Sequence, residues 1–597
     1  MITPVYFNCA GRQAEDSERT HSSSLTAPAD AAKPTGDGNG KWQRPPAARH
    51  RSASRDIALA QRTNYSSVII SLVRQVWVLY HERRILMTRK LLVLLCTLTV
   101  CTTLLFVATA SAQFYDAGQA GPFNLRFNSR TPESVQPNLD PATFLPTAVY
   151  HTAGQLGWYA AVADMNGDGK PDLLAVSYSS VKNGNGTVAV LLGNGDGTFQ
   201  TPQVFDTGGS YSVSFVVGDL NGDGKPDVVV ASMSCGSCGS SQSGVRVLIG
   251  TGNGRLRLGG IYSTGGFPFS SGQGSSIPMA IADLNGDGKP DLVVINQTTS
   301  TYGDGVAGVL IGNGDGTFKP VVSYDTGAFG AGSFAIGDLN NDGKLDLAIA
   351  NCAPKGTTAC PGNNGKISVL RGRGDGTFRP ASVYRRGGGA LFSGPVVIAD
   401  VNSDSRPDLL VGNYCLLKLG DCVGNGSVGV LLARSDGSFM PPVTYDSGGF
   451  DASSIVIADV SGDGKPDLVV SNGAVGVLIG NGNGTFQPGV SYATGGNTGA
   501  VLVTDLNHDN IPDIVATNGT SDTAAVLLGQ GSGTFTAPTL LPLGGVAYAS
   551  PVVAADLNGD TFVDLVSANW CIKQSVCHVS GSEAGTLGVV LNNSAPH

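Results

Sequence analysis

A short acidic motif occurs eight times in this 597-residue chain, and its repetition is the feature that most limits the possible folds. The motif places Asp at position 1, Asn or Ser at position 3, and Asp at positions 5 and 9. The eight copies begin at Asp164, Asp219, Asp283, Asp338, Asp400, Asp459, Asp505 and Asp556, and we number the repeats 1 to 8 accordingly. Their starts lie 46 to 64 residues apart, so the chain is built from similar units that stack on one another.

Each repeat has the same order of short apolar runs. One run enters the acidic loop, as at 214–218, and a second leaves it, as at 228–231. A third run, such as 188–192, leads into a glycine-rich turn at 193–199, and a fourth follows, as at 321–324. Four short strands with turn residues between them predict an all-β chain of four-stranded propeller blades. The 84 glycines agree with a turn-rich β protein.

The two ends of the array predict how it closes. Repeat 8 has a third strand at 588–591, but the sequence stops at His597 without a fourth. Residues 144–152 resemble the fourth strand of other repeats, such as 318–326. An N-terminal strand that completes the last blade would remove exposed sheet edges. We therefore expect a β-propeller over residues 141–597 with eight blades, and the alternative is seven blades plus a detached repeat.

The acidic loops have the chemistry of a cation site. Oxygen-bearing side chains at positions 1, 3, 5 and 9, with glycine at position 6 in most copies, form a cage typical of calcium. Position 6 is Ser405, Asn510 and Thr561 in repeats 5, 7 and 8. Serine and threonine adopt positive φ poorly, so repeats 5 and 8 are the weakest candidates, and the strongest are repeats 1, 2, 3, 4 and 6. The alternative for any one loop is an Asp-Gly hairpin without metal.

The acidic loops and the recurrent Gly-Asn-Gly-Asp-Gly-Thr-Phe turn resemble FG-GAP or VCBS-type repeats, which are related to the β-propeller head of integrin α chains. The resemblance covers about residues 141–597. It implies calcium between the first two strands of each blade, in up to eight sites. Integrin heads have seven blades and usually fewer metal loops than this chain, and nothing similar to the rest of an integrin is present.

The resemblance implies side-chain ligands at positions 1, 3, 5 and 9. In repeats 1 to 4 and 6 it also implies the backbone carbonyl of position 7. In repeats 1 to 4 these residues are Asp164, Asn166, Asp168, Lys170 and Asp172; Asp219, Asn221, Asp223, Lys225 and Asp227; Asp283, Asn285, Asp287, Lys289 and Asp291; and Asp338, Asn340, Asp342, Lys344 and Asp346. In repeats 5 to 8 they are Asp400, Asn402, Asp404 and Asp408; Asp459, Ser461, Asp463, Lys465 and Asp467; Asp505, Asn507, Asp509 and Asp513; and Asp556, Asn558, Asp560 and Asp564.

The N-terminal 112 residues differ from the remainder. Met87 to Lys90 and the apolar run 91–108 precede Ala110-Ser111-Ala112, a pattern typical of a secretory signal peptide at 87–112 that is cleaved after Ala112. The alternative is an uncleaved membrane anchor. We interpret residues 1–86 as a disordered upstream extension outside the native protein and 113–140 as a linker, and we expect a secreted, surface or periplasmic monomer.

The negative charge of the chain argues against one class of partner, and the placement of the cysteines predicts disulfides. Beyond residue 112, 23 Lys and Arg face 39 Asp and Glu, and 24 of the Asp lie in the acidic loops, which argues against a nucleic-acid partner. Four close pairs predict local disulfides between the second and third strands: Cys235/Cys238, Cys352/Cys360, Cys415/Cys422 and Cys571/Cys577.

The connections between strands 2 and 3 and between successive repeats vary most, and chain direction places them opposite the acidic loops. Loops on a rigid scaffold are common binding sites. We therefore expect a non-catalytic binding or adhesion module for protein or glycan on this face, and the alternative is a polysaccharide-cleaving enzyme. The candidate contact residues are Trp158, Tyr159, Tyr211, Phe267, Phe269, Tyr302, Phe392, Tyr414, Phe450, Tyr548 and Trp570. Any one of them can instead serve inter-blade packing.

Overall fold

The structure is a computed structural model. It describes residues 142–152, 155–179, 185–234, 244–267, 277–298, 303–357, 360, 365–388, 394–414, 416–418, 421–423, 425–519, 521–545, 552–569 and 585–594. Every regular element in these ranges is a strand, as expected for an all-β chain. None of the described elements is a helix suited to crossing a membrane. The predictions for residues 1–86, 87–112 and 113–140 lie outside the described residues.

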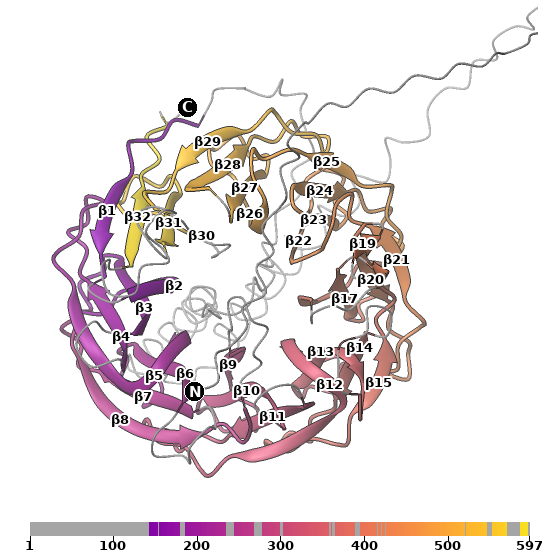
Figure 1. The fold of residues 1–597 in the computed structure, drawn as a ribbon, viewed down its shortest axis with the longest axis horizontal. Coiled ribbons are helices and arrows are strands. Elements are labelled where there is room, and N and C mark those ends of the chain that lie inside the picture. Colours follow the sequence, from indigo (N-terminus) through magenta and orange to yellow (C-terminus); the bar gives the residue numbers. More distant parts are fainter. Residues whose placement is uncertain are drawn as a thin grey trace, which may run out of the picture. The chain divides into compact units, whose positions relative to one another are not determined.

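Repeats 1 and 2 form one seven-stranded antiparallel sheet in chain order (Figure 1). Its strands are β2 (Gln155–Ala163), β3 (Asp172–Ser179), β4 (Asn185–Leu191), β5 (Gln203–Gly218), β6 (Asp227–Ser234), β7 (Gly244–Gly250) and β8 (Leu256–Ser263). The long strand β5 serves both repeats, because its first half pairs with β4 and its second half pairs with β6. The expected fourth strand of one repeat and first strand of the next are therefore continuous here.

Repeats 3 and 4 form a second seven-stranded sheet of the same kind. Its strands are β9 (Met279–Ala282), β10 (Asp291–Gln297), β11 (Asp304–Leu310), β12 (Val322–Gly337), β13 (Asp346–Pro354), β14 (Lys366–Leu370) and β15 (Ser382–Arg385). Strand β12 is the shared one: its N-terminal half pairs with β11 and its C-terminal half pairs with β13.

Repeats 5, 6 and 7 each form a separate four-stranded antiparallel sheet. The strands are β16 (Val396–Ala399), β17 (Asp408–Asn413), β20 (Ser427–Leu431) and β21 (Val443–Asp446); β22 (Ser454–Ala458), β23 (Asp467–Ser471), β24 (Val475–Leu478) and β25 (Val490–Tyr492); and β26 (Thr498–Thr504), β27 (Asp513–Asn518), β28 (Thr523–Leu527) and β29 (Thr539–Pro542). A small hairpin of β18 (Leu416–Lys418) and β19 (Asp421–Val423) lies between β17 and β20 in the chain.

The last sheet joins the two ends of the repeat array. Its order is β1-β32-β31-β30, with β1 at Ala148–His151, β30 at Val552–Ala555, β31 at Asp564–Asn569 and β32 at Thr586–Val590. Strand β1 pairs antiparallel with β32 from Ala148 opposite Val589 to His151 opposite Thr586, and the two strands lie side by side in Figure 1. The prediction that an N-terminal strand completes repeat 8 is confirmed.

The core lies between neighbouring repeats. The strands that leave the acidic loops are buried throughout, as in β10, so their apolar runs are continuous rather than alternating. Consecutive repeats share hydrophobic clusters, and one cluster joins the first and last repeats through Leu173 and Ala189 on one side and Val566 and Leu587 on the other. Repeat 8 therefore packs against repeat 1 in the same manner as its neighbours pack on each other.

Aromatic pairs explain the recurrent phenylalanine of the glycine-rich turn. This phenylalanine meets, edge to face, a tyrosine from the outer strand of the preceding repeat, with ring centroids 5.3 to 5.6 Å apart. The six pairs are Tyr150–Phe199, Tyr262–Phe318, Tyr324–Phe378, Tyr384–Phe439, Tyr445–Phe486 and Tyr492–Phe535. Such pairs contribute about 0.5–1.5 kcal/mol beyond burial, so each one fastens two repeats together.

Candidate metal sites in the acidic loops

Each acidic loop connects the first and second strands of its repeat. In repeat 3, the loop leaves β9 after Ala282 and enters β10 at Asp291. The residues at positions 4 and 6, Gly286 and Gly288, have left-handed φ values of 73° and 77°, and a Cβ at either would meet nothing within 4 Å. The loop reverses direction through these two residues, which explains why glycine is common at both positions.

Backbone N–H groups hold the exposed side chains of the loop. Asp283 at position 1 accepts hydrogen bonds from the N–H of Gly286 (2.7 Å) and of Gly288 (2.8 Å). Asn285 at position 3 accepts one from the N–H of Asp287 (2.8 Å). Repeat 1 has the same bonds, to Asp164 from Gly167 and Gly169. The oxygens at positions 1 and 3 are therefore fixed by the backbone before any cation is considered.

The aspartate at position 9 is fully buried and joins the acidic loop to the glycine-rich turn of its own repeat. Asp291 accepts hydrogen bonds at Oδ2 from the N–H of Leu284 (3.0 Å) and at Oδ1 from the N–H of Gly312 (2.7 Å). Equivalent pairs of bonds reach Asp172, Asp227, Asp408, Asp513 and Asp564. The spacing of the motif indicates only a metal ligand at position 9 and does not predict this second role.

Burial perturbs the same carboxylates. It raises the pKa of Asp513 to about 7 and the pKa of Asp227, Asp408 and Asp564 to about 6, with smaller raising contributions from the negative charges at positions 1 and 5. The backbone N–H donors oppose this shift. A positive charge in the loop would offset both the burial and the repulsion.

The acidic loops also contact the next repeat. The N–H of Gly254 in the turn of repeat 2 donates to the carbonyl of Met165 in the loop of repeat 1 (3.2 Å). Corresponding bonds run from Gly316 to Leu220, from Gly484 to Val401 and from Gly533 to Val460. In repeat 8, the side chain of Asn592 donates to the carbonyl of Leu506 (2.7 Å). Each of these loops therefore orders a junction between repeats as well as its own hairpin.

The loops without glycine at position 6 keep the same backbone. Ser405, Asn510 and Thr561 have φ values of 63°, 63° and 76°, and their N–H groups donate to the position 1 aspartates at 2.7, 2.8 and 2.9 Å. Ser405 and Thr561 adopt the left-handed φ that the sequence predicts to be unfavourable for them, and their N–H groups nevertheless donate to the position 1 aspartate as in the other loops.

The donor chemistry of the loops fits a hard cation. The set consists of carboxylate, amide and carbonyl oxygens, and a carboxylate oxygen that accepts one N–H keeps a further lone-pair site. Ser461 differs, because its hydroxyl donates to Asp459 (3.4 Å). In the described part of the chain, no three His, Cys, Asp or Glu side chains are grouped as a metal site. Calcium therefore stays a prediction from the oxygen-rich loops.

Several loops contain a positively charged side chain. Lys225 lies 3.4 Å from Asp223, Lys465 lies 2.7 Å from Asp463, and Arg406 pairs with Asp404. These three cations belong to position 7 of their own loops, and their side chains are 40 to 44% exposed. In repeat 4, Arg371 comes from outside the loop and pairs with Asp346 at position 9 (2.5 Å).

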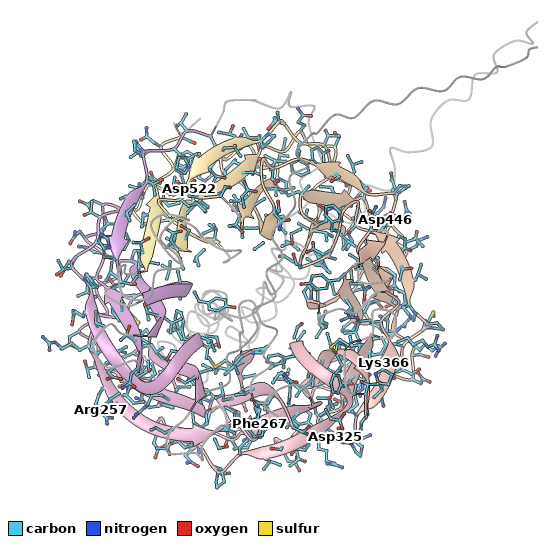
Figure 2. All side chains as sticks on the ribbon, in the orientation of Figure 1. Arg257, Phe267, Asp325, Lys366, Asp446 and Asp522 are labelled. Carbon is cyan, nitrogen blue, oxygen red and sulfur yellow. A yellow bond between two sulfur atoms is a disulfide. The ribbon has the colours of Figure 1, made fainter. Side chains whose placement is uncertain are left out.

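The opposite ends of the strands carry a different set of contacts. Asp325, which is labelled in Figure 2, lies in the half of β12 that pairs with β11. It accepts a hydrogen bond from the N–H of Gly327 (2.7 Å) and pairs with Lys355 of repeat 4. The predicted disulfide Cys352–Cys360 closes the connection that bears Lys355 and is confirmed. The bridges expected for Cys235/Cys238, Cys415/Cys422 and Cys571/Cys577 lie outside the described side chains.

The aromatic candidates on this face divide into three groups. Phe450 is 70% exposed, in the connection between repeats 5 and 6. Phe267 and Tyr414 are partly buried, and Tyr159 packs on the core between repeats. The positions or side chains of the remaining candidates, Trp158, Tyr211, Phe269, Tyr302, Phe392, Tyr548 and Trp570, lie outside the described residues.

The repeated antiparallel sheets and the acidic loop between the first two strands of each repeat define an all-β repeat protein. Comparison with known families agrees: residues 164–230, 235–294, 283–349, 358–411 and 505–567 match the FG-GAP-like repeat. The chain belongs to this family, as the motif predicted. It is also similar to mouse (Mus musculus) integrin alpha-IIb, with 32% identity over 155 residues that cover 24% of this chain and 15% of the integrin.

Solved structures with similar folds are distant. An Agrocybe aegerita lectin that recognises non-reducing terminal N-acetylglucosamine has 19% identity and a TM-score of 0.37, over 64% of this chain and 94% of the lectin. The V. cholerae biofilm matrix protein Bap1 has 14% identity and a TM-score of 0.34, over 81% of this chain and 91% of Bap1. Similarity at this level carries no information about a ligand.

Proposed function

We propose that this chain is an exported, calcium-stabilised β-propeller of eight four-stranded blades that acts as a binding or adhesion module for an extracellular protein or glycan. The FG-GAP-like repeats and the similarity to part of an integrin α chain support a binding module. The pairing of β1 with β32, together with the cluster between repeats 1 and 8, supports eight blades in one ring rather than seven and a detached repeat.

The observation that carries the calcium proposal is the set of oxygen-bearing side chains in the acidic loops, and the double attachment of the position 9 aspartate connects such a site to the fold. This residue connects the acidic loop to the glycine-rich turn, and the loop in turn contacts the next repeat. The side chains of positions 1, 3, 5 and 9 and the carbonyl of position 7 would hold the ion. Calcium supplies positive charge that relieves repulsion among the carboxylates. At a tenfold excess over Kd, one site stabilises the fold by about 1.4 kcal/mol, so several sites together decide whether the ring stays folded.

We place the binding surface at the opposite ends of the strands. The acidic loops are occupied with scaffold contacts, whereas the connections on the other face differ in length and content between repeats. Phe450 is an exposed aromatic side chain on that face. Exposed aromatic residues are frequent anchors in interfaces, and truncating an anchor commonly costs 2 kcal/mol or more.

The test is retention on protein and glycan arrays, with and without EGTA. We expect a retained ligand in calcium, loss of retention in EGTA, and at least tenfold weaker binding for Phe450→Ser. Val443→Ser is the matched control, because Val443 is 54% exposed but lies on the outer strand β21, away from the proposed binding face. The Val443→Ser variant should bind the ligand as tightly as the wild type. No retained ligand, combined with turnover of a polysaccharide, would replace the proposal with the enzyme alternative.

A further inference from the structure

The residue that precedes the glycine-rich turn forms a regular contact between repeats. In seven repeats it is aliphatic: Leu192, Ile249, Ile311, Leu432, Ile479, Leu528 and Leu591. The side chain of Ile249 lies so close to Gly316 of the next repeat that a Cβ there would be 2.5 Å from its Cδ1. Leu192 and Leu591 lie equally close to Gly254 and Gly197. This apolar contact is therefore the normal junction between repeats.

Repeat 4 departs from this pattern, because the equivalent residue is Arg371. Its guanidinium makes three contacts, of which two join repeat 4 to repeat 5. Nη1 pairs with Asp346 Oδ2 at 2.5 Å, Nη2 donates to the carbonyl of Gly437, and Cζ lies 5.8 Å from the ring centroid of Phe439. The first contact is within repeat 4 and the other two reach the turn of repeat 5.

Oδ2 of Asp346 is consequently saturated, because it has two donors. Oδ1 accepts the N–H of Gly372 (2.8 Å), and Oδ2 accepts the N–H of Leu339 (3.1 Å) as well as Arg371. In six other repeats the position 9 aspartate accepts one N–H at each oxygen. Asp467 has a third donor, but it is the neutral N–H of Ser461 (2.9 Å).

The Arg371 pair is also much less hydrated than the other cation pairs in the loops. The side chains of Arg371 and Asp346 are 15% and 0% exposed, whereas the lysines and arginine at position 7 are 40 to 44% exposed. An exposed position 7 side chain can turn into solvent when a metal enters. Turning Arg371 into solvent would break its contacts with Gly437 and Phe439 as well as with Asp346. If Arg371 stayed in place, an entering calcium ion would lie close to a largely buried guanidinium of the same charge sign, which is unfavourable.

We propose that Arg371 is the built-in cation of repeat 4, so that the Asp338 loop is held by this guanidinium in preference to calcium. The inference rests on the proposed calcium binding by the other loops. It predicts that repeat 4 adds no calcium site at concentrations that fill the loops of repeats 1 to 3, and that the junction between repeats 4 and 5 stays fastened when calcium is removed.

The experiment is calcium titration of the chelator-treated full chain by isothermal titration calorimetry. Arg371→Leu restores the side chain found at this place in repeats 1, 5, 7 and 8, and should raise the calcium stoichiometry by one. Asp342→Ala removes position 5 of the repeat 4 loop. It should leave the wild-type stoichiometry unchanged but abolish the site gained in Arg371→Leu. Asp287→Ala, the equivalent change in repeat 3, should lower the stoichiometry by one in both backgrounds.

The outcomes separate the two proposals. If the wild type binds no calcium, the proposed function fails. If it binds calcium, but Asp342→Ala removes one site from the wild type, or a folded Arg371→Leu gains none, the inference about Arg371 is wrong. The measurement on Asp342→Ala in the wild-type background does not depend on how Arg371→Leu folds.

Discussion

The position 9 aspartate is predicted to support the fold even without metal, and repeat 3 offers a matched pair for testing this. Asp291→Ala and Asp287→Ala each remove one proposed calcium ligand from the same loop. Asp291 is fully buried and accepts two backbone N–H groups, whereas Asp287 is exposed and accepts the N–H of Lys289 (3.0 Å). The two variants should therefore differ in thermal stability when calcium is removed with EGTA. Both should lose the calcium site of repeat 3.

The magnitude follows from the hydrogen bonds. Leaving a buried N–H without a partner costs about 1–3 kcal/mol, so Asp291→Ala removes roughly 2–6 kcal/mol from the free energy of unfolding. Burial raises the pKa of Asp291, so removal of the carboxylate recovers part of this cost, and we expect about 2–4 kcal/mol net. Asp287→Ala should cost about 0.5 kcal/mol in EGTA.

The assay is thermal unfolding by circular dichroism. With an unfolding entropy of roughly 2.1 cal/mol/K per residue over about 450 residues, Asp291→Ala should lower Tm by about 2–4 °C in EGTA and Asp287→Ala by less than about 1 °C. At a tenfold excess of calcium over Kd, each variant should lose a further ~1.4 kcal/mol relative to the wild type. Equal Tm values for the two variants in EGTA would refute the anchoring role of Asp291.

Two further predictions concern backbone strain and pH. Thr561→Gly should stabilise the fold by about 0.5–1 kcal/mol, because Thr561 is β-branched and has a φ of 76°. Gly288→Thr should destabilise the fold by a similar amount. Chemical denaturation measures both changes, and changes of the opposite sign would contradict backbone strain at this position. Burial raises the pKa of Asp513 from 3.8 to about 7, so the folded state holds this proton more tightly than the unfolded state. The protonated Asp513 therefore contributes fully to stability below about pH 4, and this contribution is lost as pH rises to about 7 in EGTA. Asp513→Asn should remove this fall of Tm between about pH 4 and pH 7. An unchanged dependence of Tm on pH would argue against the raised pKa.

Much of the fold was predictable from local pattern. The acidic loops, the glycine-rich turns and the short apolar runs predicted the strand order, and the unpaired third strand of repeat 8 indicated β1 as its partner. The merging of strands into β5 and β12 was not predictable, since it depends on how sharply the chain turns between repeats. The candidate ligands were also found from spacing, but the burial of position 9 was not.

Arg371 marks the limit of the motif-based approach. The equivalent position is aliphatic in the seven other repeats, and our sequence-based predictions did not include Arg371 or any partner for it. Asp346 is 25 residues away, and Gly437 and Phe439 belong to the next repeat. A long cationic side chain at this place can reach several acceptors, and the packing of one sheet on the next selects among them.

The sequence by itself therefore determined the repeated β units, their oxygen-rich loops and the strand that completes the last repeat, because spacing and strand period are properties of the local chain. Only the tertiary structure decided what those loops hold together. The buried aspartates, the tyrosine–phenylalanine pairs and Arg371 act across turns and between repeats, where the angle and separation of packed sheets select the partner.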